Sequence, residues 1–507
     1  MSDFYLNRNK RSNVKTVFKQ HPLESILLGL WQFKDEISSI EKAYTTTIAI
    51  EFCEPGPYDN ISKNIEKTTV LKLVNLATNY CLNYSESGDK FSKEKNDIFY
   101  NVFNLMANQL SVSDSSPGDY ARALLMFEII PNEIKKDKFK HCLAKAFLQD
   151  TGYSINEYIQ VCFLAVSAIT ANGYFTDDYL EKATTVTQSP CFKTMNTILS
   201  DISASAIHYR RERKRLNSLN SFKYQPLLIY PLIKPWSQIP KHSKRKRYLS
   251  PLPDLIAHKA NIGIYHHFLS KYKTKFTRFF GKEIFERYVS KALSNCCHGD
   301  IIIDESVIKA GNKIPQGVKI PDFLFIKDNK GIIIECKAAV LPLGVFTNGS
   351  MIDFKTTVNK IYKGVIQTAN FEEHAINKSL YNVTEWIRLV ITYEPLWGIN
   401  SGILSETLIT DFKDENEALN FKAEFDKVQI LSISQLDNIQ AHTSDTDSLF
   451  SILKRLKNSD FNDVIKDLIS KTGRTFKDSY LAKYTEQLID SLLPEMSTLN
   501  QSKVIKK

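Results

Sequence analysis

The chain has 507 residues, of which 43% are apolar and 24% charged, and its formal net charge is +10. This composition excludes a disordered protein, and the length is greater than one hydrophobic core usually supports. No stretch stays uncharged for the roughly 18 residues that a membrane helix needs, and no apolar signal region follows the charged start. We therefore expect a soluble, cytoplasmic protein with several folding units and no membrane partner.

Residues 1–207 carry apolar side chains mostly at helical spacing. Leu73, Leu76 and Ala77 are one example, because residues three and four positions apart lie on the same face of a helix. Clusters of Gly, Pro, Ser and Asp interrupt the pattern at intervals, as turns between helices do. The pattern predicts an all-α N-terminal domain.

Residues 208–254 have a different character, because prolines stand at positions 226, 231, 235 and 240 among runs of Lys and Arg. Prolines at this density do not continue a helix, so we expect an irregular basic connector. Basic side chains bind nucleic-acid phosphates without reading sequence, although runs of charge are also common on solvated surfaces. The candidate nucleic-acid-binding residues are Arg210, Arg211, Arg213, Lys244, Arg245, Lys246 and Arg247.

An aromatic and basic mixture follows at residues 265–280, where Lys271, Lys273, Lys275 and Arg278 lie among Tyr and Phe. Two interpretations fit this segment. Its aromatic side chains either stack on the bases of a nucleic-acid strand or belong to the core face of a helix.

The segment 255–445 alternates between helical and strand patterns, and residues 446–507 return to helical spacing. This alternation predicts an α/β unit with a mixed sheet between helices, followed by C-terminal helices. The predicted helices are 280–294, 354–376, 446–470 and 476–493, and the predicted strands are 301–308, 319–327, 331–340, 386–393 and 427–433.

Two apolar runs flank the turn at residues 328–330 and predict a hairpin of buried strands. Pairing the runs about this turn places Asp322 beside Glu335 and Lys337. Because side chains alternate along a strand, Glu335 and Lys337 share one face while Cys336 points to the other.

Each ionised group inside an apolar sheet lowers the free energy of unfolding by about several kcal/mol unless it is paired or binds a cation. Two neighbouring carboxylates, Asp322 and Glu335, form the oxygen-rich site that Mg²⁺ or Mn²⁺ prefers, and Lys337 beside them suits phosphodiester hydrolysis. The alternative is a buried Asp–Lys ion pair in an unrelated hairpin.

The motif Pro321-Asp322, followed by Glu335-Cys336-Lys337 on the next apolar strand, resembles the PD-(D/E)xK nuclease superfamily over about a third of the chain. The resemblance implies a restriction-endonuclease-like fold and a Mg²⁺-dependent endonuclease. It also implies that Glu286, after Phe285, is a metal ligand with Asp322 and Glu335, and that Gln367 belongs to the catalytic set. Glu286 as a solvated acid and Gln367 as an ordinary exposed residue are the alternatives.

Two functions remain open at this stage. The first is a nuclease, with DNA as its expected substrate and a role in bacterial anti-phage defence by analogy with the superfamily. The second is a catalytically silent subunit that binds nucleic acid or assembles with other proteins. In the first case we expect the N-terminal helices to bind a partner protein, and double-strand cutting would favour a homodimer.

Overall fold

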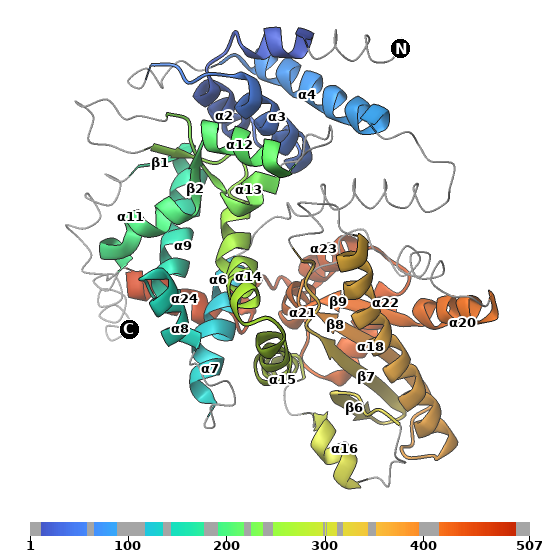
Figure 1. The fold of residues 1–507 in the computed structure, drawn as a ribbon. Helices are drawn as coiled ribbons and strands as arrows, with labels where there is room; N and C mark the ends of the chain where they lie inside the picture. The colour runs from blue at the N-terminus through green and yellow to red at the C-terminus, as the bar shows by residue number, and fades with distance from the viewer. Residues whose placement is uncertain are drawn as a thin grey trace.

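The computed structural model describes residues 12–57, 65–88, 117–134, 143–176, 191–216, 225–236, 247–297, 300, 302–311, 318–342, 351–394 and 415–492. These residues form helices and two small sheets, each of which combines parallel and antiparallel strands (Figure 1). The expected mixture of helix and sheet is therefore present.

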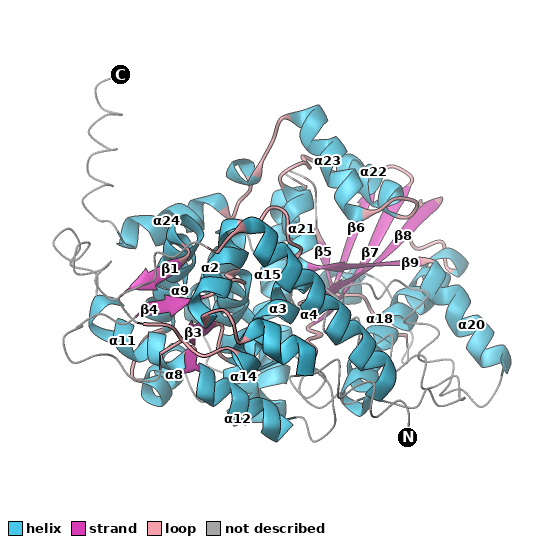
Figure 2. Ribbon diagram, turned by 90° about the horizontal axis from the view of Figure 1, so that it is seen from above, coloured by secondary structure: helices cyan, strands magenta, loops and turns pink. Residues whose placement is uncertain are grey.

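The larger sheet has the strand order β5-β6-β7-β8-β9. Its strands fan out side by side in Figure 2. The β5–β6 and β6–β7 pairs are antiparallel, whereas β7, β8 and β9 run parallel to one another. The bounds are Ile303–Asp304 for β5, Phe323–Lys327 for β6, Lys330–Lys337 for β7, Glu385–Thr392 for β8 and Val428–Ser432 for β9.

The β6–β7 hairpin is confirmed with the predicted register. Phe323 pairs with Ile334 and Lys327 with Lys330 across a turn at Asp328, whose φ of 54° is left-handed. The middle of β7 is a run of isoleucines that is fully buried. Apolar β-branched residues that are buried on both faces are typical of a central strand.

Helices cover both faces of this sheet. Helix α18 (Met351–Asn377) packs on β7 and β8 from one side. On the other side, the alternate residues of β7 and β8 share a core with three helices. These helices are α15 (Glu286–Cys296), α21 (Ile433–Gln440) and α22 (Thr446–Leu456), and α20 (Glu415–Asp426) packs on α18.

One helical path joins the helical half of the molecule to the sheet (Figure 1). It begins with α14 (Asp254–Phe279), continues as the π-helix η2 (Phe280–Phe285) and enters α15 without a break. Lys273 kinks α14, because its φ of 48° is not helical. Single π turns inside longer helices often occur at functional sites.

The N-terminal half is largely helical, as predicted. Capping boxes begin α3 and α9, where Ser38 pairs with Glu41 and Ser154 with Glu157, and Gly173 ends α9 with a φ of 80°. The helices are α2 (Leu23–Gln32), α3 (Ser39–Phe52), α4 (Lys67–Gly88), α6 (Pro117–Leu124), η1 (Leu125–Ile129), α7 (Ile130–Glu133), α8 (Leu143–Thr151), α9 (Ile155–Asn172) and α11 (Cys191–Asp201).

The prediction of an all-α N-terminal domain was wrong in one respect. Strands β1 (Tyr174–Thr176) and β2 (Ser203–Ser205) join β3 (Leu232–Lys234) and β4 (Arg247–Leu249) in a small sheet of order β1-β4-β3-β2. Strands of three residues leave too short an alternation to be recognised in a sequence.

The prediction of an irregular connector over 208–254 was also wrong. Its first residues lie in α12 (Ala206–Leu216), and α13 (Gln225–Ile229), β3 and β4 follow. The prolines at 226, 231, 235 and 240 all lie beyond α12. The arginine-rich run is therefore free to be helical, and arginine has a high helix propensity.

The apolar clusters cross the predicted boundaries at 207/208, 254/255 and 445/446. One cluster joins α6, α9 and α14 to one face of the larger sheet and to the C-terminal helices, and another joins α2, α3 and α4 to α18. Helix α24 (Ala482–Leu492) packs on α6, after α23 (Phe461–Thr472) and η3 (Phe476–Asp478). The segments therefore share cores instead of packing separately.

The expected strand at 301–308 is mostly a helix. Only Ile303–Asp304 is β5, and α16 (Glu305–Gly311) begins at once because the Asp304 carboxylate accepts the N–H groups of Ser306 and Val307. Among the described residues no single helix is long and apolar enough to cross a membrane, although α8 and α9, bent by 67° at their junction, pass this test as a pair.

Candidate active site

Asp322, Glu335 and Lys337 come together at one end of the β6–β7 hairpin. Asp322 directly precedes β6, and its Oδ2 accepts the backbone N–H of Cys336 at 2.7 Å. The Lys337 ammonium donates to Oε1 of Glu335 on the same face of β7. The structure thus brings together the three residues that the sequence places in one cluster.

Helix α18 closes at Gly364 over the face of β7 that carries Glu335 and Lys337. A Cβ at this glycine would lie 3.1 Å from Cε of Lys337 and 3.4 Å from Cγ of Glu335. One turn further along α18, the side-chain amide of Gln367 donates to Oε2 of Glu335 and to the Ile320 carbonyl oxygen, both at 2.7 Å. The structure therefore places Gln367 in the cluster, as an orienting contact of Glu335.

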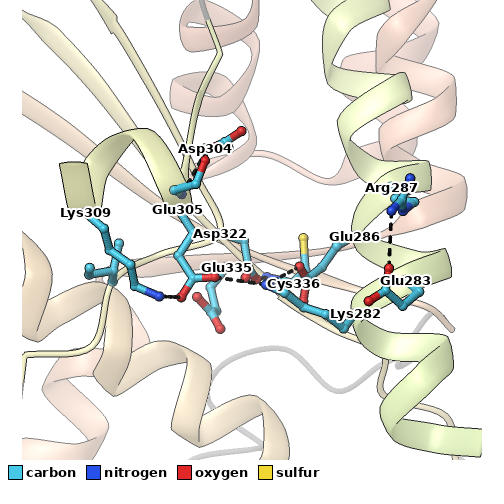
Figure 3. A network of polar contacts seen from close by, with 12 residues as sticks. Lys282, Glu283, Glu286, Arg287, Asp304, Glu305, Lys309, Asp322, Glu335 and Cys336 are labelled. Carbon is cyan, nitrogen blue, oxygen red and sulfur yellow. Dashed lines mark hydrogen bonds and ion pairs between the residues drawn. The ribbon is translucent and has the colours of Figure 1, made fainter. Parts of the chain in front are cut away.

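Glu286, the first residue of α15, approaches the cluster from another element. Lys282 donates to Glu286 at 2.8 Å and to Glu305 at 2.9 Å (Figure 3). Glu305, the first residue of α16, and Lys282 are site residues that the sequence reasoning missed. Since Asp304-Glu305 lay in a predicted strand, only the Asp304 cap signal would have placed Glu305 at a helix start.

A buried polar network holds α15 in position. The carboxylate of Asp437 on α21 accepts the hydroxyl of Tyr288 at 3.0 Å and Nε of Arg122 at 2.8 Å. All three side chains are almost fully buried. Because Tyr288 lies two residues after Glu286, this network fixes the helix that carries Glu286 against the sheet.

The carboxyl groups of Asp322, Glu335 and Glu286 lie close enough to change one another's pKa values. Burial, and next the nearby charge of Asp322, raises the pKa of Glu335 to about 8. The same two causes raise the pKa of Glu286 to about 7. Burial also raises the pKa of Asp322, although the Cys336 N–H and the charge of Lys337 act in the opposite direction. Mutual repulsion of this kind requires that the carboxylates lie close together.

This arrangement retains protons at neutral pH that exposed carboxyl groups would lose. A hard divalent cation among the same oxygens would favour the ionised forms and offset the repulsion. The donor set of Asp322, Glu335 and Glu286 consists of carboxylates alone, which fits Mg²⁺ or Mn²⁺ better than a thiolate-preferring metal.

The carboxylates of Glu335 and Glu286 are bonded to neighbouring side chains. In the part of the chain that the structure describes, no three His, Cys, Asp or Glu side chains are arranged to hold a metal ion. Oε1 of Glu335 is bonded to Lys337 and Oε2 to Gln367, while Lys282 pairs with Glu286. Coordination by these residues therefore requires rotation of side chains, with Lys337 and Lys282 moving away from the carboxylates.

A cavity of about 350 Å³ lies beside the part of α15 that follows Glu286, from Ser290 onward. Its lining is polar and carries two carboxylates, with no basic side chain. The lining residues are Ser290, Ser294, Cys297, Asp300, Ile302 and Asp304. The cavity therefore offers a polar and acidic lining, in which Asp300 is paired with Lys327.

Arg210, the first residue of the basic runs predicted to bind phosphate, is bonded within the protein instead. Arg210 donates to the Ile50 carbonyl oxygen at 2.7 Å and to Glu54 at 2.9 Å, and also bonds the Cys53 carbonyl oxygen. The prediction that Arg210 binds phosphate is therefore wrong, because its guanidinium caps the end of α3.

The remaining members of the basic runs are less defined. Arg211 is an exposed residue of α12, and the side chain of Arg213 in the same helix lies outside the described residues. Arg247 is half-buried in β4. Lys244, Arg245 and Lys246 lie outside the described residues.

Most aromatic side chains of residues 265–280 belong to the core, although Tyr272 and Phe279 are only half-buried. Tyr265, Phe268, Phe276 and Phe280 are buried and pack on one another. Of the two interpretations of this segment, stacking of these rings on nucleic-acid bases is excluded, because the rings have no exposed face.

Comparisons with protein-family models, with curated proteins and with solved structures found no match to this chain.

Proposed function

We propose that the chain is a metal-dependent nuclease of the PD-(D/E)xK type that hydrolyses phosphodiester bonds, with DNA as its substrate. The observation that carries the proposal is the meeting of Asp322, Glu335 and Lys337 at one end of a buried hairpin, with Glu286 and Gln367 beside them. We also propose that the larger sheet and the helices on its two faces form a restriction-endonuclease-like core.

The residues divide the chemical work among them. Asp322, Glu335 and Glu286 would hold a Mg²⁺ or Mn²⁺ ion. When bound, such an ion would polarise a phosphoryl oxygen and lower the pKa of bound water. Released from Glu335, the Lys337 ammonium would lie against the reacting phosphate and stabilise its developing negative charge.

The other groups position these side chains. Gln367 fixes the plane of the Glu335 carboxylate through Oε2, and the backbone N–H of Cys336 fixes Asp322. Hydrogen bonds of this kind orient metal ligands in many sites, and their loss typically lowers activity about 10- to 100-fold.

Incubation of the purified protein with plasmid DNA and with RNA tests the proposal. With Mg²⁺ or Mn²⁺ we expect nicking or cutting of DNA that EDTA stops and that Lys337→Ala lacks. If the wild type leaves every DNA and RNA substrate intact across a range of both metals, the nuclease proposal fails.

A second candidate function is a catalytically silent subunit that binds nucleic acid or assembles with other proteins. The occupied oxygens of Glu335 favour it, because both are bonded within the protein. Calorimetric titration with Mn²⁺ separates the two candidates. A nuclease site binds the ion and loses it on Asp322→Ala, whereas a silent subunit gives no metal-binding heat and still binds DNA.

A role in anti-phage defence, a partner protein for the N-terminal helices and a homodimer stay predictions. Each has its own test. Protection of bacteria against phage plating tests the first, co-purification of a protein that depends on α2, α3 and α4 tests the second, and light scattering tests the third.

A further inference from the structure

The helical path into Glu286 carries a row of basic side chains. Lys275, Arg278, Lys282 and Glu286 follow one another at steps of three, four and four residues. Residues at these steps lie on one face of a helix, and the 2.8 Å ion pair between Lys282 and Glu286 confirms this across η2. We call Lys275, Arg278 and Lys282 the basic row.

The basic row faces solvent. Lys275 and Arg278 are exposed, and the side chain of Lys282 is 55% exposed. The opposite face of the same path is anchored in the core by Phe276 and Phe280, which are fully buried. The helix therefore cannot turn its basic face inward.

The charge of this row is largely uncompensated. Among the described residues, neither Lys275 nor Arg278 forms an ion pair, and neither does Lys273 at the kink. Lys271, one turn earlier, is paired with Asp150. Positive charge thus remains directed at solvent at Lys275 and Arg278, whereas Lys282, next to Glu286, is paired with Glu286 and Glu305.

The row has the dimensions of a strand contact. From residue 275 to residue 286 the helical rise amounts to about 16 Å, and successive phosphates of one strand advance about 3.4 Å along a duplex. The row is therefore long enough to follow several successive phosphates of one strand.

The two directions along the path from Glu286 differ in charge. Toward the end of α15 the polar cavity carries Asp300 and Asp304. Toward α14 the surface carries the basic row. A phosphate backbone that approaches the carboxylate cluster is attracted on the second side by Lys275 and Arg278, whereas on the first side Asp300 is paired with Lys327.

We propose that the basic row binds the sugar-phosphate backbone of the nucleic-acid substrate on one side of the bond to be cleaved. This inference rests on the proposed nuclease function and adds the path of the substrate to it. The binding is independent of base sequence, because the row itself offers only charged side chains to the phosphates, while Tyr265, Phe268, Phe276 and Phe280 are buried.

The test measures binding separately from cleavage. In a Lys337→Ala background without divalent metal, fluorescence anisotropy gives the affinity for labelled single-stranded DNA, duplex DNA and RNA at several salt concentrations. The variant is Lys275→Gln with Arg278→Gln. Its control is Lys457→Gln with Lys466→Gln, which removes the same charge from exposed positions at the C-cap of α22 and on α23.

We expect the row variant to bind about tenfold more weakly at physiological salt. The slope of log affinity against log salt should fall by about 1.8 for duplex DNA, since each lost phosphate contact removes about 0.9. The control variant and the conservative variant Lys275→Arg with Arg278→Lys should bind like the parent protein. The three substrates show whether the row prefers one kind of strand.

An unchanged affinity and slope in the row variant would overturn the inference, as would an equal loss in the control or no nucleic-acid binding at all. Cleavage by the wild-type chain is scored independently. A chain that cuts DNA but whose row variant binds normally keeps the nuclease function and loses this substrate path. A chain that binds through the row and never cuts loses the nuclease function alone.

Discussion

The side-chain amide of Gln367 on α18 donates a hydrogen bond to the carboxylate of Glu335 on β7, with 2.7 Å between Nε2 and Oε2. The same amide reaches the carbonyl oxygen of Ile320, two residues before Asp322. One side chain therefore ties the helix, the carboxylate and the start of the hairpin together.

Gln367→Ala should lower the cleavage rate about 10- to 100-fold, because Glu335 loses the contact that fixes its orientation. The control is Asn370→Ala, which changes an exposed residue of the same helix. The measurement is single-turnover cleavage at several Mg²⁺ concentrations, with thermal melting alongside. Equal rates for wild type and Gln367→Ala would show that this bond does not serve the site.

Gly364→Ala should impair cleavage more than stability. The added Cβ would lie 3.1 Å from Cε of Lys337, so the flexible lysine would have to move away from its place beside Glu335. We expect a loss of about tenfold or more in rate, since small misplacements of catalytic groups are costly. Gly281→Ala is the matched control, because its Cβ would meet no atom within 4 Å. Similar activities of the two variants would contradict this account of α18.

Arg210→Gln should destabilise the fold without weakening nucleic-acid binding. Its guanidinium bonds two carbonyl oxygens and Glu54 at the end of α3, and the loss of such charged hydrogen bonds typically costs about 1–3 kcal/mol. Arg211→Gln, at the exposed neighbouring position, serves as the control. Urea unfolding and anisotropy titrations give the two readouts. If Arg210→Gln had normal stability and a reduced affinity for nucleic acid, Arg210 would be a phosphate-binding residue after all.

The stability of the metal-free protein should fall as the pH rises through the neutral range. The pKa of Glu335 is raised from 4.5 to about 8 in the folded state. The folded state therefore holds a proton that the unfolded state releases above its own, lower pKa. This contribution is present at acid pH and is lost progressively between about pH 4.5 and pH 8.

Melting temperatures in EDTA across this range test the linkage. Glu335→Gln should show a flatter dependence on pH than the wild type, whereas Glu385→Gln, at an exposed site, should follow the wild type. Mg²⁺ should raise the melting temperature of the wild type most at the alkaline end. Parallel curves for wild type and Glu335→Gln would show that burial and repulsion at this carboxylate are weaker than proposed.

The hairpin with Asp322, Glu335 and Lys337 could be predicted because its determinants are local. Two apolar runs, one turn and the alternation of side chains fix which residues meet, and the register agrees with the structure. Helices α15, α18 and α22 were also recognisable from their spacing, although their ends were not, whereas α16, α20 and α21 were not predicted.

Arg210 could not be placed from the sequence, because its carbonyl partner at Ile50 lies 160 residues away. A run of Lys and Arg has the same sequence pattern whether it lies on a solvated face, binds nucleic acid or forms a tertiary contact. Lys282 and Glu305 were missed for a related reason. Their pairing depends on how α16 packs beside η2, which no local pattern specifies.

The most direct test of the catalytic cluster is the single-turnover rate of DNA cleavage with Mg²⁺ by the wild type, Asp322→Ala, Lys337→Ala and the double variant. We predict that each single variant loses activity by about a thousandfold or more and that the double variant loses little further, because the residues act as a unit. Circular dichroism should confirm that all four proteins are folded. A Lys337→Ala variant that cuts at the wild-type rate would contradict the assignment.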